Sequence, residues 1–482
     1  MPRHVHMLFR LGLWAALSGM VLGACGGGSS SASSGTGAGA ATGPNVAALS
    51  VDSFPPYGTD SCAPAPGCGS LNQLYITLRV CPHGSTSNCQ TIDHVAVDTG
   101  SLGLRLLAAS LRPPTSSFLG SAGGLLAALP TITTTSAGGN GTTVTGTLAE
   151  CAQFGGGYSW GSIRNVDITF VGTNETASNV PMQVMGDMEP APAACVTQST
   201  TQYALTGSGT NSSGVVTANP LTYPYLGANG LIGVSLFAQD CQPCATVAQP
   251  QQGNNTAGLA YVVCADMTGN HCTPTTVAPA MQVVNPITAL PTDNNGFLIR
   301  MAAVGSDGAA SASGSMIFGI GTQANNALGS ATRIAANPAE EPGFVYTTYS
   351  GSANAYGIFD SGSSLYFFSD ASIALCGSSG VLAAYYCPGG PSAKGSANTT
   401  LNLRAVVNDY RDSATPSSTI AFSVNNLNNF TNAAAYAYDN VGGPGPASFG
   451  YFIWGMPTFY GKTIYFGLAD NADGYAAPYY AF

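Results

Sequence analysis

Short apolar runs separated by polar, glycine-rich turns make up most of this sequence. Residues 74–80 (LYITLRV) alternate apolar and polar positions, and residues 91–97 and 157–172 have the same strand-like character. Alternation over about 4–8 residues predicts half-buried β-strands. Helical periodicity is scarce, and the best short helix is expected at residues 370–376. The pattern therefore predicts a mostly β fold.

Two of the apolar runs end in the same four-residue pattern. Residues 91–97 lead into Asp98-Thr99-Gly100-Ser101, and a second apolar segment follows at residues 102–107. Residues 356–359 lead into Asp360-Ser361-Gly362-Ser363, again followed by an apolar segment. The two aspartates are 262 residues apart (360 minus 98), so the pattern is a weak internal repeat.

The residue types in these loops point to one kind of chemistry. The glycine lets the backbone turn tightly and approach the carboxylate closely, and Ser101 and Ser363 can donate hydrogen bonds to its oxygens. If the two loops meet, both carboxyl groups cannot ionise at once, so the pair shares one proton. Such a pair can activate one water while it protonates a carbonyl, which hydrolyses a peptide bond without a metal, a cofactor or a covalent intermediate.

The paired loops resemble those of the pepsin-like aspartic peptidases. In that family an apolar-apolar-Gly segment passes behind each catalytic loop, and residues 231–234 (LIGV) and 453–456 (IWGM) match these segments. Residues 314–321 fall where the family's lobe-joining strand precedes the second loop. The resemblance covers about residues 70–470. The chain is also similar to a family of bacterial lipoproteins that carry the Asp-Thr-Gly-Ser signature and have no assigned activity.

The resemblance implies a bilobal pepsin-like fold, with β lobes at residues 46–322 and 323–482 and a central cleft. Asp98 and Asp360 would be the catalytic dyad of an acid-favouring endopeptidase that acts on an extended polypeptide. Six neighbours would support them: Thr99, Gly100, Ser101, Ser361, Gly362 and Ser363. No cofactor and no metal are expected, and the protein is expected to be a monomer. Some proteins of this fold are inactive, so the alternative is a catalytically inactive lipoprotein that binds peptides or glycans at the cell envelope.

The family's N-terminal lobe also carries a β-hairpin flap, whose tyrosine closes over the substrate. The equivalent segment here is residues 154–161 (FGGGYSWG). The place of the flap tyrosine falls near Phe154, and Tyr158 would need a register shift to occupy it. Phe154, Tyr158 and Trp160 are therefore candidates for lining the cleft. The alternative is that Tyr158 and Trp160 are strand aromatics packed in a core.

The N-terminal segment has the features of a bacterial export signal. Two arginines precede an apolar run at residues 11–22, which is too short to be a comfortable membrane span. The run ends in Leu22-Gly23-Ala24-Cys25, which resembles a lipobox. We therefore expect a signal peptide at residues 1–24, lipidation of Cys25 and a flexible tether at residues 25–45; an ordinary signal peptide is the alternative. The residue after Cys25 is glycine and not an acidic retention signal, so the resemblance to Gram-negative lipoproteins implies the outer membrane, on its periplasmic or surface face, with the lipid as the membrane contact.

The cysteine count fits an exported protein. There are 13 cysteines, and setting Cys25 aside leaves twelve, enough for six disulfides. Cys81–Cys89 and Cys376–Cys387 are expected to close local loops, although the pairing as a whole does not follow from the sequence. A zinc site is the alternative for four cysteines, and an oxidising compartment argues against it. These are Cys241, Cys244, Cys264 and Cys272.

The charge balance limits the classes of partner that the protein is expected to bind. The chain has 22 acidic and 12 basic residues, a net charge of −10, and removal of Arg3 and Arg10 with the signal peptide would make this −12. An acidic surface with only two lysines repels phosphate backbones, which argues against nucleic-acid binding. A polypeptide substrate or ligand is expected instead.

Two other chemical motifs are present. Residues 157–161 (GYSWG) formally fit the nucleophile elbow of serine hydrolases, but an elbow needs a strand before it and a helix after it, and the following residues alternate like a strand. Asp93-His94 is open to interpretation as a catalytic base or metal ligand. The preferred interpretation is a histidine that lies on the surface or has its hydrogen bonds satisfied by neighbours.

Overall fold

The computed structural model describes most of the chain after residue 40. The described ranges are 41–53, 71–111, 124–137, 143–154, 157–198, 209–210, 216–217, 226–248, 260–339, 343–350, 352–378, 381–393, 399–411, 417–432, 434–445, 450–469 and 478–482. The predicted signal peptide, Cys25, nearly all of the predicted tether, and Cys62 and Cys68 lie outside them.

The fold is mostly β, as predicted. Among the described residues, sixteen strands form one sheet, in which β5 (Thr133–Ala137) pairs with β6. Its path runs β13 (Cys272–Pro274), β12 (Tyr261–Cys264), β6 (Thr143–Phe154), β7 (Gly157–Phe170), β8 (Thr176–Met185), β4 (Leu102–Leu107), β11 (Gly230–Val234), β3 (Gln90–Asp98), β2 (Tyr75–Pro82), β1 (Val46–Val51), β15 (Ala312–Phe318), β14 (Gly296–Met301), β24 (Thr463–Gly467), β25 (Tyr479–Ala481) and β16 (Arg333–Ala335).

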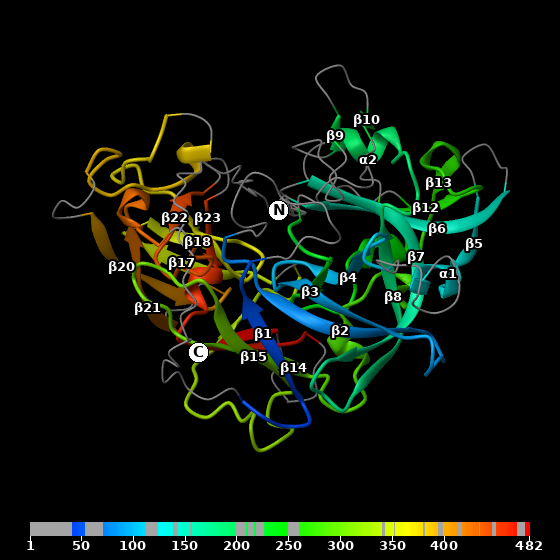
Figure 1. Ribbon diagram of the computed structural model, residues 1–482, viewed down its shortest axis with the longest axis horizontal. Helices are drawn as coiled ribbons and strands as arrows, with labels where there is room; N and C mark the ends of the chain where they lie inside the picture. The colour runs from blue at the N-terminus through cyan, green and yellow to red at the C-terminus, as the bar shows by residue number, and fades with distance from the viewer. Residues whose placement is uncertain are drawn as a thin grey trace, which may run out of the picture.

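A second sheet of seven strands lies on the opposite side of the view in Figure 1 from strands β5 to β8. Its order is β21 (Ser417–Asn425), β20 (Thr400–Asn408), β17 (Val345–Tyr349), β18 (Ser352–Asp360), β23 (Tyr451–Gly455), β19 (Tyr366–Phe368) and β22 (Gly442–Pro444). A separate two-stranded pair joins β9 (Gly209–Thr210) and β10 (Val216–Thr217).

Helix is confined to short segments in the described part of the chain, α1 (Gly124–Ala128) and α2 (Ala193–Gln198), besides single 3-10 turns. The helix expected at residues 370–376 is wrong. The carboxylate of Asp370 accepts hydrogen bonds from the backbone N–H and the hydroxyl of Ser372, which closes a turn instead. Leu375 then forms an isolated bridge with Tyr386, beside the Cys376–Cys387 disulfide. No helix in the described ranges is long and apolar enough to cross a membrane.

The strands nearest the first Asp loop are buried on both faces. Strands β4 and β11 are buried at every position, and so is the last part of β3. Because β7 pairs with β2 as well as with β6 and β8, the strands β2, β7, β8, β4, β11 and β3 close into a barrel. Strands β4 and β11 have no exposed face, which explains their nearly continuous apolar sequence.

The end of the chain returns to the large sheet. Strand β24 pairs with β14, and β25 joins β24 to β16. The predicted second lobe at residues 323–482 therefore contributes three strands to the sheet that holds the first lobe's strands. The pattern of apolar residues in a strand carries no information about which strand will be its partner.

One hydrophobic core reaches both sheets. It contains Val97 and Leu104 from the first sheet together with Phe359, Trp454 and Phe422 from the second. Trp454 and Phe359 are fully buried, and burial of such a side chain contributes roughly 1.5–3 kcal/mol.

Five disulfides connect described cysteines. The two predicted local bridges, Cys81–Cys89 and Cys376–Cys387, are confirmed. Cys151–Cys195 joins β6 to α2. The four cysteines of the alternative zinc site form two disulfides, Cys241–Cys244 and Cys264–Cys272. Their sulfur atoms are bonded to one another, so that alternative is wrong.

Candidate active site

Each of the two Asp loops follows a strand with the same neighbours. Strand β3 ends at Asp98, and β11 runs parallel to it with Gly233 opposite Asp98. Strand β18 ends at Asp360, and β23 runs parallel to it with Gly455 opposite Asp360. The strand that follows each loop, β4 or β19, pairs antiparallel with the other side of the same neighbour. The two segments that match the apolar-apolar-Gly pattern therefore occupy equivalent positions.

Glycine at positions 233 and 455 has a steric cause. A Cβ atom on Gly233 would lie 2.4 Å from the backbone nitrogen of Leu102, and one on Gly455 would lie 2.0 Å from the carbonyl oxygen of Leu365. Real Cβ atoms do not approach other atoms so closely. The glycine thus allows the strand to pass directly beside the loop.

The two loops are joined to each other by hydroxyl groups. The Thr99 hydroxyl donates to the carbonyl of Phe359 at 2.7 Å, and the Ser361 hydroxyl donates to the carbonyl of Val97 at 2.7 Å. Each hydroxyl also accepts the backbone N–H of the other residue. All four bonds are buried, so loops that are 262 residues apart in sequence form one rigid unit.

Each carboxylate is oriented within its own loop. Asp98 Oδ1 accepts the Gly100 N–H at 2.8 Å, and Asp98 Oδ2 accepts the Ser101 hydroxyl at 2.5 Å. Asp360 has the matching bonds from Gly362 at 2.9 Å and Ser363 at 2.6 Å. The support predicted for Ser101 and Ser363 is therefore present in the structure.

The two carboxyl groups lie against each other's loops. A Cβ atom on Gly100 would lie 2.7 Å from Cγ of Asp360, and one on Gly362 would lie 2.6 Å from Oδ1 of Asp98. The sequence-based explanation placed each glycine against its own aspartate. In the structure, each glycine also makes room for the aspartate of the other loop.

Burial and mutual repulsion set the protonation of this pair. Asp98 and Asp360 are only 9% and 6% exposed. Burial first, and then the charge of Asp98 and a hydrogen bond with it, raise the pKa of the Asp360 carboxyl well above its usual range, against the opposing hydrogen bonds from Ser363 and Gly362. The arrangement therefore favours one proton shared by two carboxyl groups.

The model of a protein family described as "Protein of unknown function (DUF3443)" matches residues 44–482 of this chain. The chain belongs to this family. A search of curated proteins finds no match. Both Asp loops and both glycine strands behind them lie within the DUF3443 match.

The predicted flap segment of this DUF3443 protein forms the β6–β7 hairpin, in which Phe154 pairs with Gly157. Tyr158 and Trp160 are each 2% exposed and pack in a cluster with Met188 and the Cys151–Cys195 disulfide. Burial and the charge of Glu189 raise the pKa of Tyr158 to about 12. Of the two interpretations, packing in a core is the one that this burial supports, and Phe154 is the partly exposed member of the three.

The competing motifs have structural roles. Ser159, the serine of the elbow-like motif, lies inside strand β7 and is fully buried, so the strand–turn–helix geometry of an elbow is absent there. Nε2 of His94 lies 3.1 Å from Oδ1 of Asp52, and Nδ1 of His94 lies 3.4 Å from Oδ2 of Asp93. Burial lowers the pKa of His94, but the bonds and charges of these two aspartates outweigh it and raise the pKa to about 9. His94 is therefore a satisfied, charged histidine.

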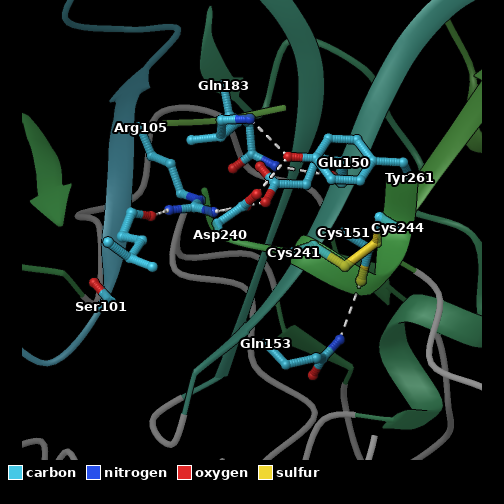
Figure 2. Close-up of polar contacts among 12 residues, drawn as sticks. Ser101, Arg105, Glu150, Cys151, Gln153, Gln183, Asp240, Cys241, Cys244 and Tyr261 are labelled. Carbon is cyan, nitrogen blue, oxygen red and sulfur yellow. Dashed lines mark hydrogen bonds and ion pairs between the residues drawn. A yellow bond between two sulfur atoms is a disulfide. The ribbon is translucent and has the colours of Figure 1, made fainter. Parts of the chain in front are cut away.

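The sequence did not predict a buried polar cluster that lies beside the first Asp loop. Figure 2 shows Arg105 on β4 directed toward Glu150 and Asp240, with Tyr261 and Gln183 around them. One signal was available, because Arg105 interrupts the apolar segment 102–107 in a chain with only 12 basic residues. Its two acidic partners are 45 and 135 residues away, and nothing in the sequence links them to it.

Proposed function

We propose that this DUF3443 protein is an aspartic endopeptidase in which Asp98 and Asp360 together activate one water molecule. The observation that carries the proposal is the meeting of two buried carboxyl groups, each held by an identical pair of hydrogen bonds from its own loop. Structural aspartates are normally paired with a cation or exposed to water. Among the described residues no cation pairs with either carboxyl group. Two carboxyl groups buried against each other in this way are costly to maintain and are typical of a catalytic dyad.

The arrangement suits general acid–base hydrolysis. With one proton on the pair, the ionised carboxylate takes a proton from the water, and the water oxygen attacks the peptide carbonyl carbon. The other carboxyl donates its proton to the carbonyl oxygen, and a tetrahedral diol forms. The first carboxyl then protonates the departing amine, while the second takes back a proton from the diol. The C–N bond breaks, and the pair again holds one proton.

The proposed fold around this dyad is the bilobal pepsin-like one. The matching arrangements β3–β11–β4 and β18–β23–β19 support two related halves with the dyad between them. An extended polypeptide would bind between the halves through main-chain hydrogen bonds.

We also propose that the protein is exported and held at the outer membrane by a lipid on Cys25. Five disulfides fit an oxidising compartment outside the cytoplasm. Cys25 and nearly all of the predicted tether lie outside the described residues, so the lipid anchor is supported by sequence alone.

The test is cleavage of an unfolded polypeptide mixture by the purified protein at acidic pH. Asp98→Asn and Asp360→Asn should each lower the rate by about 10²–10⁴-fold, since each removes one partner in proton transfer. Asp266→Asn is the matched control, because Asp266 is exposed and bonds only to its own turn and His271. Cleavage that survives both dyad substitutions would overturn the proposal. Saturable peptide binding without any turnover, unchanged in Asp98→Asn, would favour the inactive binding protein instead.

A further inference from the structure

Arg105 is a buried cation that follows the first Asp loop on strand β4. It is 2% exposed, and its Nη2 atom donates to Glu150 Oε1 at 2.6 Å and to Asp240 Oδ2 at 2.8 Å. Its Nη1 atom donates to the carbonyl oxygen of Leu102, the residue immediately after the loop. The guanidinium therefore contacts the end of the catalytic loop and two acidic residues at once (Figure 2).

The partners of Arg105 come from different elements. Glu150 lies on β6, the first arm of the hairpin, and Asp240 lies after β11, the strand that passes behind Asp98. Tyr261 on β12 donates to Asp240 Oδ1 at 2.7 Å, and Gln183 on β8 donates to the carbonyl of Glu150 at 2.8 Å. Because the cluster is buried, these bonds are weakly screened and fix the elements relative to one another.

The same guanidinium reaches the end of the hairpin. Arg105 Cζ lies 5.5 Å from the centre of the Phe154 ring, within the range of a cation–π contact. Phe154 also packs against a cluster that includes Ala96 and Leu107. Side chains alternate along a strand, so Ala96 and Asp98 project from the same face of β3. The end of the hairpin is thus attached to the face from which Asp98 projects.

The raised pKa of Asp240 favours one proton on this cluster. Arg105 carries one positive charge, whereas Glu150 and Asp240 could carry two negative charges. Burial first, and then the charge and hydrogen bond of Glu150, raise the pKa of Asp240 well above its usual range, although Arg105 and Tyr261 oppose this shift. With Asp240 protonated, the cluster is neutral, so it can remain buried.

We propose that Arg105 is a positioning residue that holds the β6–β7 hairpin against the Asp98 loop. The effect of Arg105 on catalysis rests on the proposed function. Lysine cannot replace it, because the planar guanidinium alone offers several directed N–H groups and a flat face for an aromatic ring. Without this attachment, the hairpin would move relative to the carboxyl pair. Substrate bound between them would then be misaligned.

The experiment combines amide hydrogen exchange with cleavage kinetics in Arg105→Lys and Phe154→Leu. Both variants should raise exchange in β6 and in the adjoining part of β7 by roughly tenfold, with the second sheet unchanged. Both should lower kcat/KM, by up to about 10²-fold in Arg105→Lys, and a misaligned substrate should lower kcat as well as raise KM. Arg79→Lys is the matched control, since Arg79 lies on β2 and its side chain is exposed.

Phe154→Leu keeps the inference testable if Arg105→Lys fails to fold, because Phe154 is only partly buried. Unchanged exchange in the hairpin of folded Arg105→Lys or of Phe154→Leu overturns the inference, as does an equal rise in the second sheet, which would signal general destabilisation. Faster hairpin exchange in the variants supports the inference about Arg105 even if the wild-type protein does not cleave the polypeptide. Faster exchange together with no cleavage would overturn only the proposed function.

Discussion

Thr99 and Ser361 hydrogen-bond to each other's backbone. The Ser361 N–H donates to Thr99 Oγ1 at 2.9 Å, and the Thr99 N–H donates to Ser361 Oγ at 3.1 Å. Each hydroxyl also donates a hydrogen bond to a backbone carbonyl of the strand that leads into the other loop, so it is both a donor and an acceptor. Serine and threonine are equivalent in this role because only the hydroxyl takes part, which explains why one loop has Asp-Thr-Gly and the other Asp-Ser-Gly.

Replacement of Thr99 by valine should destabilise the protein, whereas serine should be tolerated. Valine keeps the shape but leaves the Ser361 N–H and the Phe359 carbonyl buried without their partner, at a cost of about 1–3 kcal/mol per unsatisfied group. Serine keeps the hydroxyl and loses only a methyl group. Urea unfolding of Thr99→Val and Thr99→Ser measures the difference. Equal stability of the two variants would show that the hydroxyl bonds contribute nothing.

Asp98→Asn should change how stability depends on pH. The raised pKa of Asp360 means that the folded protein holds a proton more tightly than the unfolded chain, where the value is 3.8. The stability from this proton is fully present below pH 3.8 and is lost as pH rises through the raised pKa. Burial is the larger cause of the raised pKa of Asp360, and an amide at position 98 removes the second cause, the charge of Asp98.

Relative to the wild type, Asp98→Asn should therefore gain roughly 0.5–2 kcal/mol at neutral pH and little at acidic pH. Unfolding midpoints of the wild type and Asp98→Asn, measured across the pH range, test this expectation. A variant less stable than the wild type at neutral pH contradicts the shared-proton description.

Gly455→Ala should distort the second Asp loop. Its Cβ would lie 2.0 Å from the carbonyl oxygen of Leu365 and 2.6 Å from that of Ser363, so the backbone would have to shift. Overpacking of this kind costs roughly 1–3 kcal/mol. Thermal unfolding should show the loss, and Gly305→Ala is the control because, among the described residues other than its chain neighbours, none has an atom within 4 Å of its Cβ position. Similar midpoints for the two variants would contradict the packing argument.

His94 should stabilise the protein mainly below pH 9. Its pKa rises from 6.5 to about 9 because the bonds and charges of Asp52 and Asp93 outweigh burial. The stabilisation is fully present below pH 6.5 and disappears as pH rises through about 9. His94→Asn suits the backbone, since asparagine tolerates the φ of 46° at this position.

We expect His94→Asn to lose about 1 kcal/mol at pH below 6.5 and to approach the wild type above pH 9. Denaturant unfolding at both ends of this range measures the loss. A deficit that stays constant with pH would mean that the imidazole acts through packing rather than charge.

Local features were predictable where their cause lies within a few residues. Strands β2, β3 and β7 follow from the strand-like pattern of apolar and polar residues and lie close to their expected positions. The bridges Cys81–Cys89 and Cys376–Cys387 close loops of 8 and 11 residues, so proximity along the chain predicts them. The prediction of a helix at residues 370–376 was wrong because the Asp370 carboxylate accepts hydrogen bonds within a turn. The spacing of apolar residues does not reveal such local hydrogen bonds.

The sequence alone determined the internal chemistry of each Asp loop. The carboxylate of Asp98 accepts hydrogen bonds from groups two and three residues later, as does that of Asp360, so the four-residue motif contains these donors. Tertiary structure decided that the two loops meet, that β24 returns to β14, and that Arg105 finds Glu150 and Asp240. These contacts depend on sheet pairing between distant segments, and the alternation of apolar residues specifies a strand's buried face but not its neighbour.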